Sequence, residues 1–274
     1  MSDRRFVASP PAWLTLAEQR ALFELGAFMA ASPLLRALGR GDRHPVLVLP
    51  GFTAGDGSTT PLRWVLRSQG YWVHGWSLGR NLGPTQHVVD GLDARLGYVY
   101  GRHKRPVTIV GWSLGGIYAR ELARRHPHMV RQVITLGSPF QLKVGDRTRA
   151  HVLWDRLAGS FADDFVELAM VPEDARPALE VPATAIYSRG DGVVKWYTCL
   201  ERKGELRENI EVRGSHAGLG WNPAVLYAIS DRLAQREGSW KPFGAPPLLG
   251  YHYPKPVDYR PPAPRRPVDL SRRS

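Results

Sequence analysis

Residues 107–125 read Val-Thr-Ile-Val-Gly-Trp-Ser-Leu-Gly-Gly-Ile-Tyr-Ala-Arg-Glu-Leu-Ala-Arg-Arg. The β-branched apolar start predicts a buried strand, and the second half predicts a helix over 114–125. Ser113 then lies at a sharp strand-to-helix turn. Gly111 and Gly115 lack Cβ atoms, which lets the chain pass close to itself on either side of that turn. The stretch therefore predicts a serine hydroxyl lifted above a sheet, beside the N–H groups of a helix start.

The pattern Gly-x-Ser-x-Gly is not decisive by itself, because Gly-rich strand-to-helix turns also occur in nucleotide-binding folds. It appears a second time at residues 75–79, around Ser77. There the following residues, 80–84, contain Gly and Pro and would stop a helix. Ser113 is therefore the predicted nucleophile, and Ser77 is predicted to be a loop residue near the mouth of the site.

Apolar, β-branched runs alternate with helical patterns through the middle of the chain. The predicted strands are residues 44–50, 71–74, 106–111, 132–136, 183–187 and 209–212. The predicted helices between and after them include residues 61–68, 85–100, 114–125 and 223–236. This alternation predicts an α/β fold with a mostly parallel central sheet covered by helices on both faces. Such sheets bind their ligands at the carboxyl ends of the strands.

Composition divides the chain into three regions. Residues 1–40 are predicted to be a helical segment packed on the domain, with a membrane surface as the alternative position for its apolar stripe. Residues 41–236 form the predicted catalytic domain, with a helical cap insertion at about 140–180 that includes helical pieces at 148–157 and 163–170. Residues 237–274 are rich in Pro and basic, and predict an extended tail over the surface, with a docking segment as the alternative.

Composition also limits the classes of protein. The chain has 274 residues, 43% of them hydrophobic, a formal charge of +12 and one cysteine, Cys199, so an intrachain disulfide is excluded. We find no signal peptide or membrane-spanning run and expect a cytoplasmic protein. The basic residues are dispersed without a nucleic-acid motif, so we expect no nucleic-acid partner, while weak contact with a membrane surface stays open. The oligomeric state is not predicted.

Residues 44–236 resemble the α/β-hydrolase family, and within it the lipases and esterases. The resemblance is carried by the turn around Ser113, by the strand and Gly-Ser-Pro turn at residues 131–140, and by the strand and loop at residues 44–52. That loop reads Pro-Gly where the family often has His-Gly. The resemblance implies an oxyanion hole made by the backbone N–H groups of Phe52 and Leu114.

In this family the acid and the histidine follow the serine in that order. His216 follows a predicted strand and has glycines around it, whereas His151 lies in the predicted cap and His252 in the tail. Asp191 follows another strand in a Gly-Asp-Gly turn, which implies that it is the acid. The alternatives for the acid are three cap residues, Asp163, Asp164 and Asp174.

These residues predict a serine hydrolase that cleaves carboxylic esters through an acyl-enzyme. Aromatic residues suggest an apolar acyl group and a small-molecule or lipid-like ester. The pocket candidates are Trp112, Phe140, Trp154, Phe161 and Phe165. Thioesterase, amidase and acyltransferase chemistry on the same fold is one alternative, and a non-catalytic binding protein is the other. We expect no cofactor and no metal site.

Overall fold

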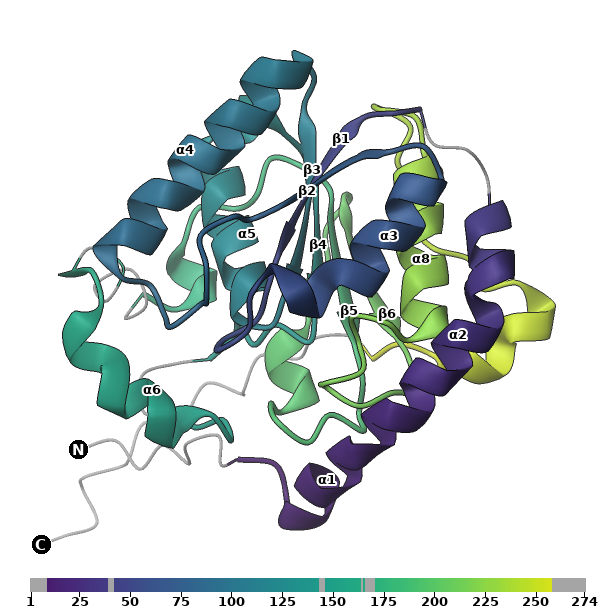
Figure 1. Ribbon diagram of the computed structural model, residues 1–274, viewed down its shortest axis with the longest axis horizontal. Coiled ribbons are helices and arrows are strands. Elements are labelled where there is room, and N and C mark those ends of the chain that lie inside the picture. The colour runs from purple at the N-terminus through teal and green to yellow at the C-terminus, as the bar shows by residue number, and fades with distance from the viewer. Residues whose placement is uncertain (1–8, 39–41, 143–145, 164, 166–170, 258–274) are drawn as a thin grey trace, which may run out of the picture.

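The central sheet is parallel throughout the part of the chain that the structure describes, residues 9–38, 42–142, 146–163, 165 and 171–257 of a computed structural model (Figure 1). The strands are β1 Pro45–Leu49, β2 Trp72–Gly75, β3 Val107–Trp112, β4 Val130–Leu136, β5 Ala183–Tyr187 and β6 Arg207–Glu211. They lie in the order β2-β1-β3-β4-β5-β6, each parallel to its neighbours. The predicted mostly parallel sheet is confirmed.

Helices cover both faces of this sheet, as Figure 1 shows. The α-helices are α1 Ala12–Leu16, α2 Ala21–Ala37, α3 Thr60–Ser68, α4 Gln86–His103, α5 Leu114–Arg125, α6 His151–Leu157 and α8 Pro223–Ala234. The 3-10 helices are η1 Ala17–Arg20, η2 Asp56–Thr59, η3 Pro127–Met129, η4 Ala158–Ser160, η5 Glu173–Ala175, η6 Trp196–Cys199 and η7 Pro247–His252. Most of the predicted cap helix at 163–170, and Asp164 in it, lie outside the described residues.

Two hydrophobic clusters correspond to the two faces. One joins Val46 and Ile134 of the sheet to α2, α3 and α8, and the other joins Leu47 and Ile109 to α4 and α5. Strands β3 and β4 are buried along their whole length, so neither shows the alternation of a strand with one solvent-exposed face. The core thus holds the carboxyl ends of the strands in fixed register.

The segments at the two ends of the described chain both pack on the domain. Helix α2 lies against α3 and α8, with Phe28 and Leu35 buried in the first cluster. Past α8, the chain runs beside the edge strand β6, where the Phe243 N–H donates to Glu208 Oε2 at 2.7 Å. Tyr253 is buried, and its hydroxyl donates to the carbonyl of Ala224 at 2.7 Å. The Pro-rich region therefore contributes to the core up to that point.

Candidate active site

Ser113 occupies the turn between β3 and α5 with φ 53° and ψ −119°. A positive φ is unfavourable for a residue with a side chain, and such strain persists only where the surrounding structure enforces it. Here the glycines on either side make the turn possible. A Cβ on Gly111 would lie 2.3 Å from the carbonyl oxygen of Gly115, and one on Gly115 would lie 2.5 Å from that of Leu49. The predicted need for glycine at both positions thus has a direct physical cause.

His216 and Asp191 form a hydrogen-bonded pair at the carboxyl ends of the last two strands. The distance from His216 Nδ1 to Asp191 Oδ2 is 2.5 Å, and both side chains are buried. Since a carboxylate only accepts, Nδ1 carries the proton and Nε2 is left free to take one. The other oxygen of Asp191 accepts from the N–H groups of Val193 and Val194, each at 2.8 Å, which fixes the carboxylate.

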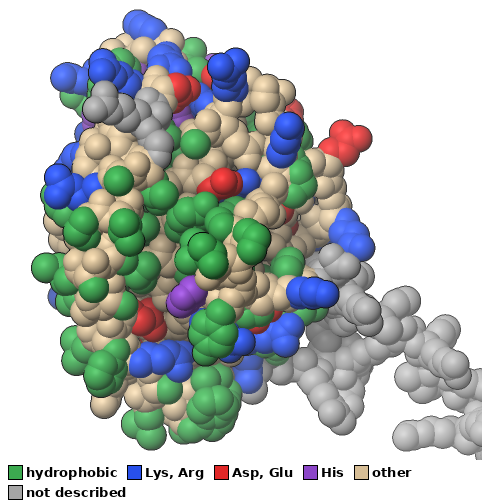
Figure 2. Space-filling model, turned by 90° about the vertical axis from the view of Figure 1, so that its right-hand side faces the viewer, with side chains coloured by type: hydrophobic (Ala, Val, Ile, Leu, Met, Phe, Trp, Pro, Cys, Tyr) green, Lys and Arg blue, Asp and Glu red, His purple; other side chains and the backbone are tan. Residues whose placement is uncertain are grey.

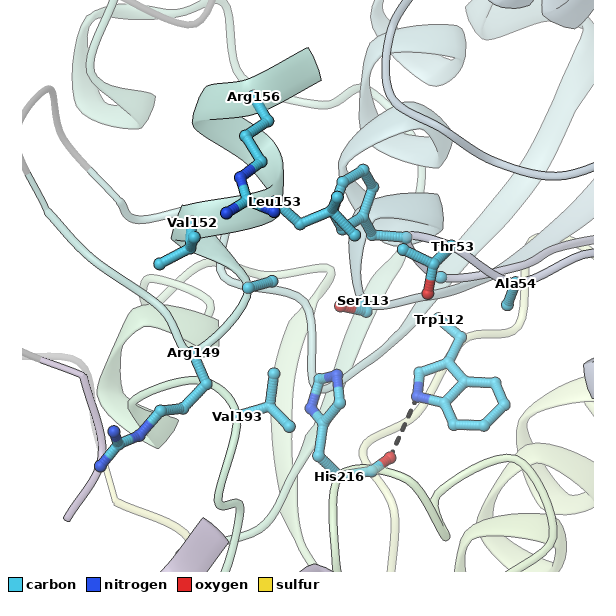
Figure 3. Close-up of a pocket in the computed structure, with 13 residues that line it drawn as sticks. Thr53, Ala54, Trp112, Ser113, Arg149, Val152, Leu153, Arg156, Val193 and His216 are labelled. Carbon is cyan, nitrogen blue, oxygen red and sulfur yellow. Dashed lines mark hydrogen bonds between the residues drawn. The ribbon is translucent and has the colours of Figure 1, made fainter. Parts of the chain in front are cut away.

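Ser113 and His216 face the same pocket of about 480 Å³. In Figure 3 the imidazole points from its loop toward the serine. Among the described residues no hydrogen bond joins the two side chains, and such bonds in hydrolases often close only around a substrate. The structure therefore brings Ser113, His216 and Asp191 together at one site.

The charge state of His216 is set by opposing effects. Burial lowers the pKa of His216, but the negative charge of Asp191, the hydrogen bond to it and the charge of Glu18 together raise it further. The net result is a pKa above the ordinary value of 6.5. The pair therefore stabilises the imidazolium that forms when a serine gives up its proton.

The loop after β1 lies directly against the serine. A Cβ on Gly51 would be 3.2 Å from Ser113 Cβ, which places the neighbouring N–H of Phe52 close to the pocket. Leu114 is the first residue of α5, so its N–H has no partner within the helix. The two backbone groups implied by the resemblance are thus available on either side of Ser113.

Asn81, which the sequence did not single out, fixes this loop. It is fully buried, its carbonyl accepts from the N–H of Thr53 at 2.6 Å, and its side-chain amide donates to the carbonyl of Pro50 at 3.0 Å. The N–H of Asn81 also donates to the carbonyl of Ala54 at 2.7 Å. A loop asparagine carries no sequence signal for such a role.

The N-terminal segment holds the loops of the histidine and the acid, a second feature that the sequence did not reveal. Glu18 accepts from the N–H groups of Gly192 at 2.8 Å, His216 at 2.9 Å and Ala217 at 2.8 Å. Glu24 accepts from the N–H of Ser215 at 2.8 Å. Two acidic residues on a segment remote in sequence therefore bind the backbone on both sides of the His–Asp pair.

Two further side chains of this segment reach the same loops. Arg20 donates to the carbonyls of Gly190 and Gly214, the second at 3.0 Å. Thr15 donates to the carbonyl of Gly192 at 3.0 Å. The candidate site is thus assembled from the sheet and from a helical segment that precedes it. The only sequence signal was acidic residues within an otherwise apolar pattern.

One of the five predicted pocket residues lines the pocket, and the other four do not. Trp112 lines the pocket, and its indole N–H donates to the carbonyl of His216 at 3.2 Å (Figure 3). The other four do not line it: Phe140 lies against Arg120, Trp154 packs on Phe52 and Phe161, and Phe165 packs on Tyr118. Those four aromatic side chains pack on other residues instead of facing the pocket.

The walls of the pocket come mostly from shorter apolar side chains. The lining residues, besides the serine and histidine, are Gly51, Phe52, Thr53, Ala54, Trp112, Arg149, Ala150, Val152, Leu153, Arg156 and Val193. Helix α6, within the predicted cap region, supplies Val152, Leu153 and Arg156 (Figure 3). The guanidinium of Arg149 is turned to the carbonyl of Pro10, whereas Arg156 is exposed at the rim.

The alternative residues lie elsewhere. Ser77 is exposed after β2, where its N–H donates to Asp56 Oδ2 at 3.1 Å, and it does not line the pocket. His151 Nδ1 lies 2.7 Å from the carbonyl of Thr148, and His252 is exposed on η7. Asp163 and Asp174 are exposed as well.

The described residues hold neither a candidate metal site nor a candidate membrane span. No cluster of three or more side chains suited to a metal ion is present in the described ranges. None of the helices described is long and apolar enough to cross a bilayer.

Two solved lipase structures have a similar architecture. Aspergillus fumigatus lipase B superposes with a TM-score of 0.54 at 18% identity, over 75% of this chain and 57% of the lipase. A Paleococcus ferrophilus monoacylglycerol lipase superposes with a TM-score of 0.51 at 14% identity, over 72% and 96% of the two chains. The chain has the α/β-hydrolase fold. At these identities the likeness concerns the α/β-hydrolase fold alone, and no family model matches the sequence.

Two curated proteins match part of the sequence. Both are pimeloyl-[acyl-carrier protein] methyl ester esterases. The one from Aromatoleum aromaticum is 31% identical over 24% of this chain and 35% of its own length. The one from Shewanella woodyi is 28% identical over 40% of this chain and 41% of its own. The chain therefore spans about two fifths or less of the curated relatives it matches.

Proposed function

We propose that this α/β-hydrolase cleaves carboxylic esters with Ser113 as nucleophile, His216 as general base and Asp191 as the acid. The observation that carries the proposal is the shared pocket. It brings a strained serine at a strand-to-helix turn together with a buried histidine whose Nδ1 is held by an aspartate. The partial likeness to ester-cleaving enzymes supports the same reaction class.

In the proposed first step His216 Nε2 takes the hydroxyl proton as Ser113 Oγ attacks the ester carbonyl. The N–H groups of Phe52 and Leu114 donate to the oxyanion that forms. The bond from the carbonyl carbon to the alkoxy oxygen then breaks, and His216 returns its proton to the departing alcohol. Water attacks the acyl-enzyme with the same histidine as base, which releases the acid and restores the serine.

The lining favours an ester with an apolar acyl group. Val152, Leu153 and Val193 present hydrocarbon to the pocket, and the exposed Arg156 is the cation on its rim. The free, buried thiol of Cys199 fits the expected cytoplasmic location, which is part of this proposal.

The test is hydrolysis of p-nitrophenyl esters from acetyl to palmitoyl by the wild type, Ser113→Ala and Ser77→Ala. Ser77 is a matched control because it stands in the second Gly-x-Ser-x-Gly and also has a positive φ of 61°. We expect Ser113→Ala to lose at least about 10³-fold in kcat, whereas Ser77→Ala keeps activity close to that of the wild type.

Other outcomes would redirect the proposal. Full activity of Ser113→Ala with loss in Ser77→Ala would place the nucleophile at the other turn. Wild-type turnover of a thioester or amide panel without ester cleavage would favour the alternative acyl chemistries. Inactivity on every panel would favour a binding protein.

A further inference from the structure

The outer side of the N-terminal segment is apolar and open to solvent. Six large side chains form what we call the outer apolar face: Trp13, Leu16, Leu22, Phe23, Met29 and Leu34, each at least 66% exposed. Every exposed position of α2 from Leu22 to Leu34 is apolar. Continuous apolar surface of this kind on a folded chain indicates a binding surface.

The two acidic side chains of α2 and the turn before it point away from this face. Glu18 and Glu24 are turned inward to the backbone of the catalytic loops. Helix α2 therefore has an inner side bound to the domain and an outer side without charge. A helix that is apolar all round is expected to be covered on both sides.

Two arginine side chains lie at the border of the face. Arg36 lies over the ring of Trp64 at 5.0 Å, at the end of α2. Arg213 lies over Tyr251 at 4.7 Å on the neighbouring η7, where Leu248 is 97% exposed. Figure 2 shows this side of the molecule, with hydrophobic side chains gathered on it and Lys and Arg side chains, with a few Asp and Glu, around them. The whole chain carries a charge of +12.

We propose that the outer apolar face docks on an anionic lipid surface, with α2 lying in the plane of the interface. Apolar side chains on one side of a helix, bordered by Arg, are what such docking requires, because the hydrocarbon enters the bilayer while the cations meet the headgroups. The positive charge favours an anionic lipid surface over a second copy of this chain as the partner, since two copies would bring like charges together. The proposal does not depend on the ester-cleaving function.

The test is cosedimentation with vesicles of phosphatidylcholine, with and without phosphatidylglycerol, at low and high salt. We expect the wild type to bind the anionic vesicles, and to bind less at high salt. A triple variant, Leu22→Ser with Phe23→Ser and Met29→Ser, should lower the partition coefficient at least about tenfold, because three apolar side chains no longer enter the bilayer. Tyr98→Ser is the matched control, an aromatic residue 51% exposed on α4, across the molecule from α2 (Figure 1).

The outcomes separate the possible occupants. Far-UV circular dichroism establishes that the triple variant is folded, as expected for exposed positions. Equal binding by wild type and triple variant, or no wild-type binding to anionic vesicles, overturns the proposal. Light scattering that shows a wild-type dimer and a monomeric triple variant would assign the face to a second copy instead.

Discussion

The pKa of His216 gives the most direct chemical consequence at the scale of single residues. A base works only when unprotonated, and the pKa of His216 lies above 6.5 because Asp191 and Glu18 outweigh the effect of burial. We therefore expect kcat/KM to rise with pH through a midpoint above 6.5. Substitution Asp191→Asn removes the charge that raises the pKa, so the midpoint should move to lower pH.

The same substitution should lower kcat by about 10⁴-fold, because an amide at this position favours the wrong tautomer of the imidazole. The pH profiles of kcat/KM for wild type and Asp191→Asn measure both effects. Asp174→Asn, at an exposed aspartate in the predicted cap region, is the control and should change neither. A midpoint that does not move would contradict the assigned acid.

Glu18 gives a second prediction, because it accepts hydrogen bonds from the backbone of the loops that carry Asp191 and His216, and its charge also raises the pKa of His216. Glu18→Gln keeps the size but loses the charge and one accepting oxygen. We expect kcat to fall about 10- to 100-fold from loop displacement, and the acidic midpoint of the pH profile to move down.

A purely structural role for Glu18 would alter stability without moving that midpoint, so the pH profile is the deciding readout. Gln19→Ala, at the exposed neighbouring position, is the control. Wild-type kcat and an unshifted profile in Glu18→Gln would remove Glu18 from the account.

Some residues of the candidate site could be predicted from the sequence, and others could not. The resemblance to the α/β-hydrolase family, together with the order of Ser113, Asp191 and His216 along the chain, predicted that these three residues share a site. Glu18 and Asn81 were not predicted, since each acts through backbone N–H or C=O groups of distant loops. Such partners depend on tertiary contacts that residue spacing does not encode.

At the scale of elements, the close packing at the turn between β3 and α5 lets us predict the effect of a substitution on stability. A Cβ on Gly115 would lie 2.5 Å from the carbonyl oxygen of Leu49 and 2.7 Å from that of Pro50, both rigid backbone atoms of β1 and its loop. Gly115→Ala should therefore lower the free energy of unfolding by at least about 1–3 kcal/mol.

Gly101 is the matched control within α4, because a Cβ there meets nothing within 4 Å. Gly101→Ala should raise the free energy of unfolding by about 0.5–1 kcal/mol, since alanine loses less backbone entropy in a helix. Urea denaturation of the two variants compares them. Equal stability of Gly115→Ala and wild type would mean that strand and helix are not as closely packed as described.

Elements themselves were predictable where burial makes the sequence regular. Strands β1, β3 and β5 follow mostly apolar runs, whereas the edge strand β6 reads Arg-Glu-Asn-Ile-Glu. The predicted helices 61–68, 85–100 and 114–125 match α3, α4 and α5 to within a few residues. The pocket aromatics were less predictable, because Trp154 and Phe161 pack on each other within the predicted cap region and the direction of a side chain depends on its tertiary contacts.

At the scale of the whole molecule, the N-terminal segment connects surface and site. Its inner side holds the loops of His216 and Asp191, while its outer apolar face is open. The helical pattern of residues 1–40 predicted an apolar stripe facing the domain. It did not reveal that apolar residues cover the outer side as well, because a helix that is apolar all round has no distinct stripe.

The central claim is that Ser113 is the activated nucleophile of this fold, and intact mass spectrometry after treatment with a fluorophosphonate tests it most directly. The account predicts one covalent adduct on the wild type, mapped by peptide sequencing to Ser113, and none on Ser113→Ala. Ser77→Ala should be labelled like the wild type. An unlabelled wild type, or a label that persists in Ser113→Ala, would contradict the account.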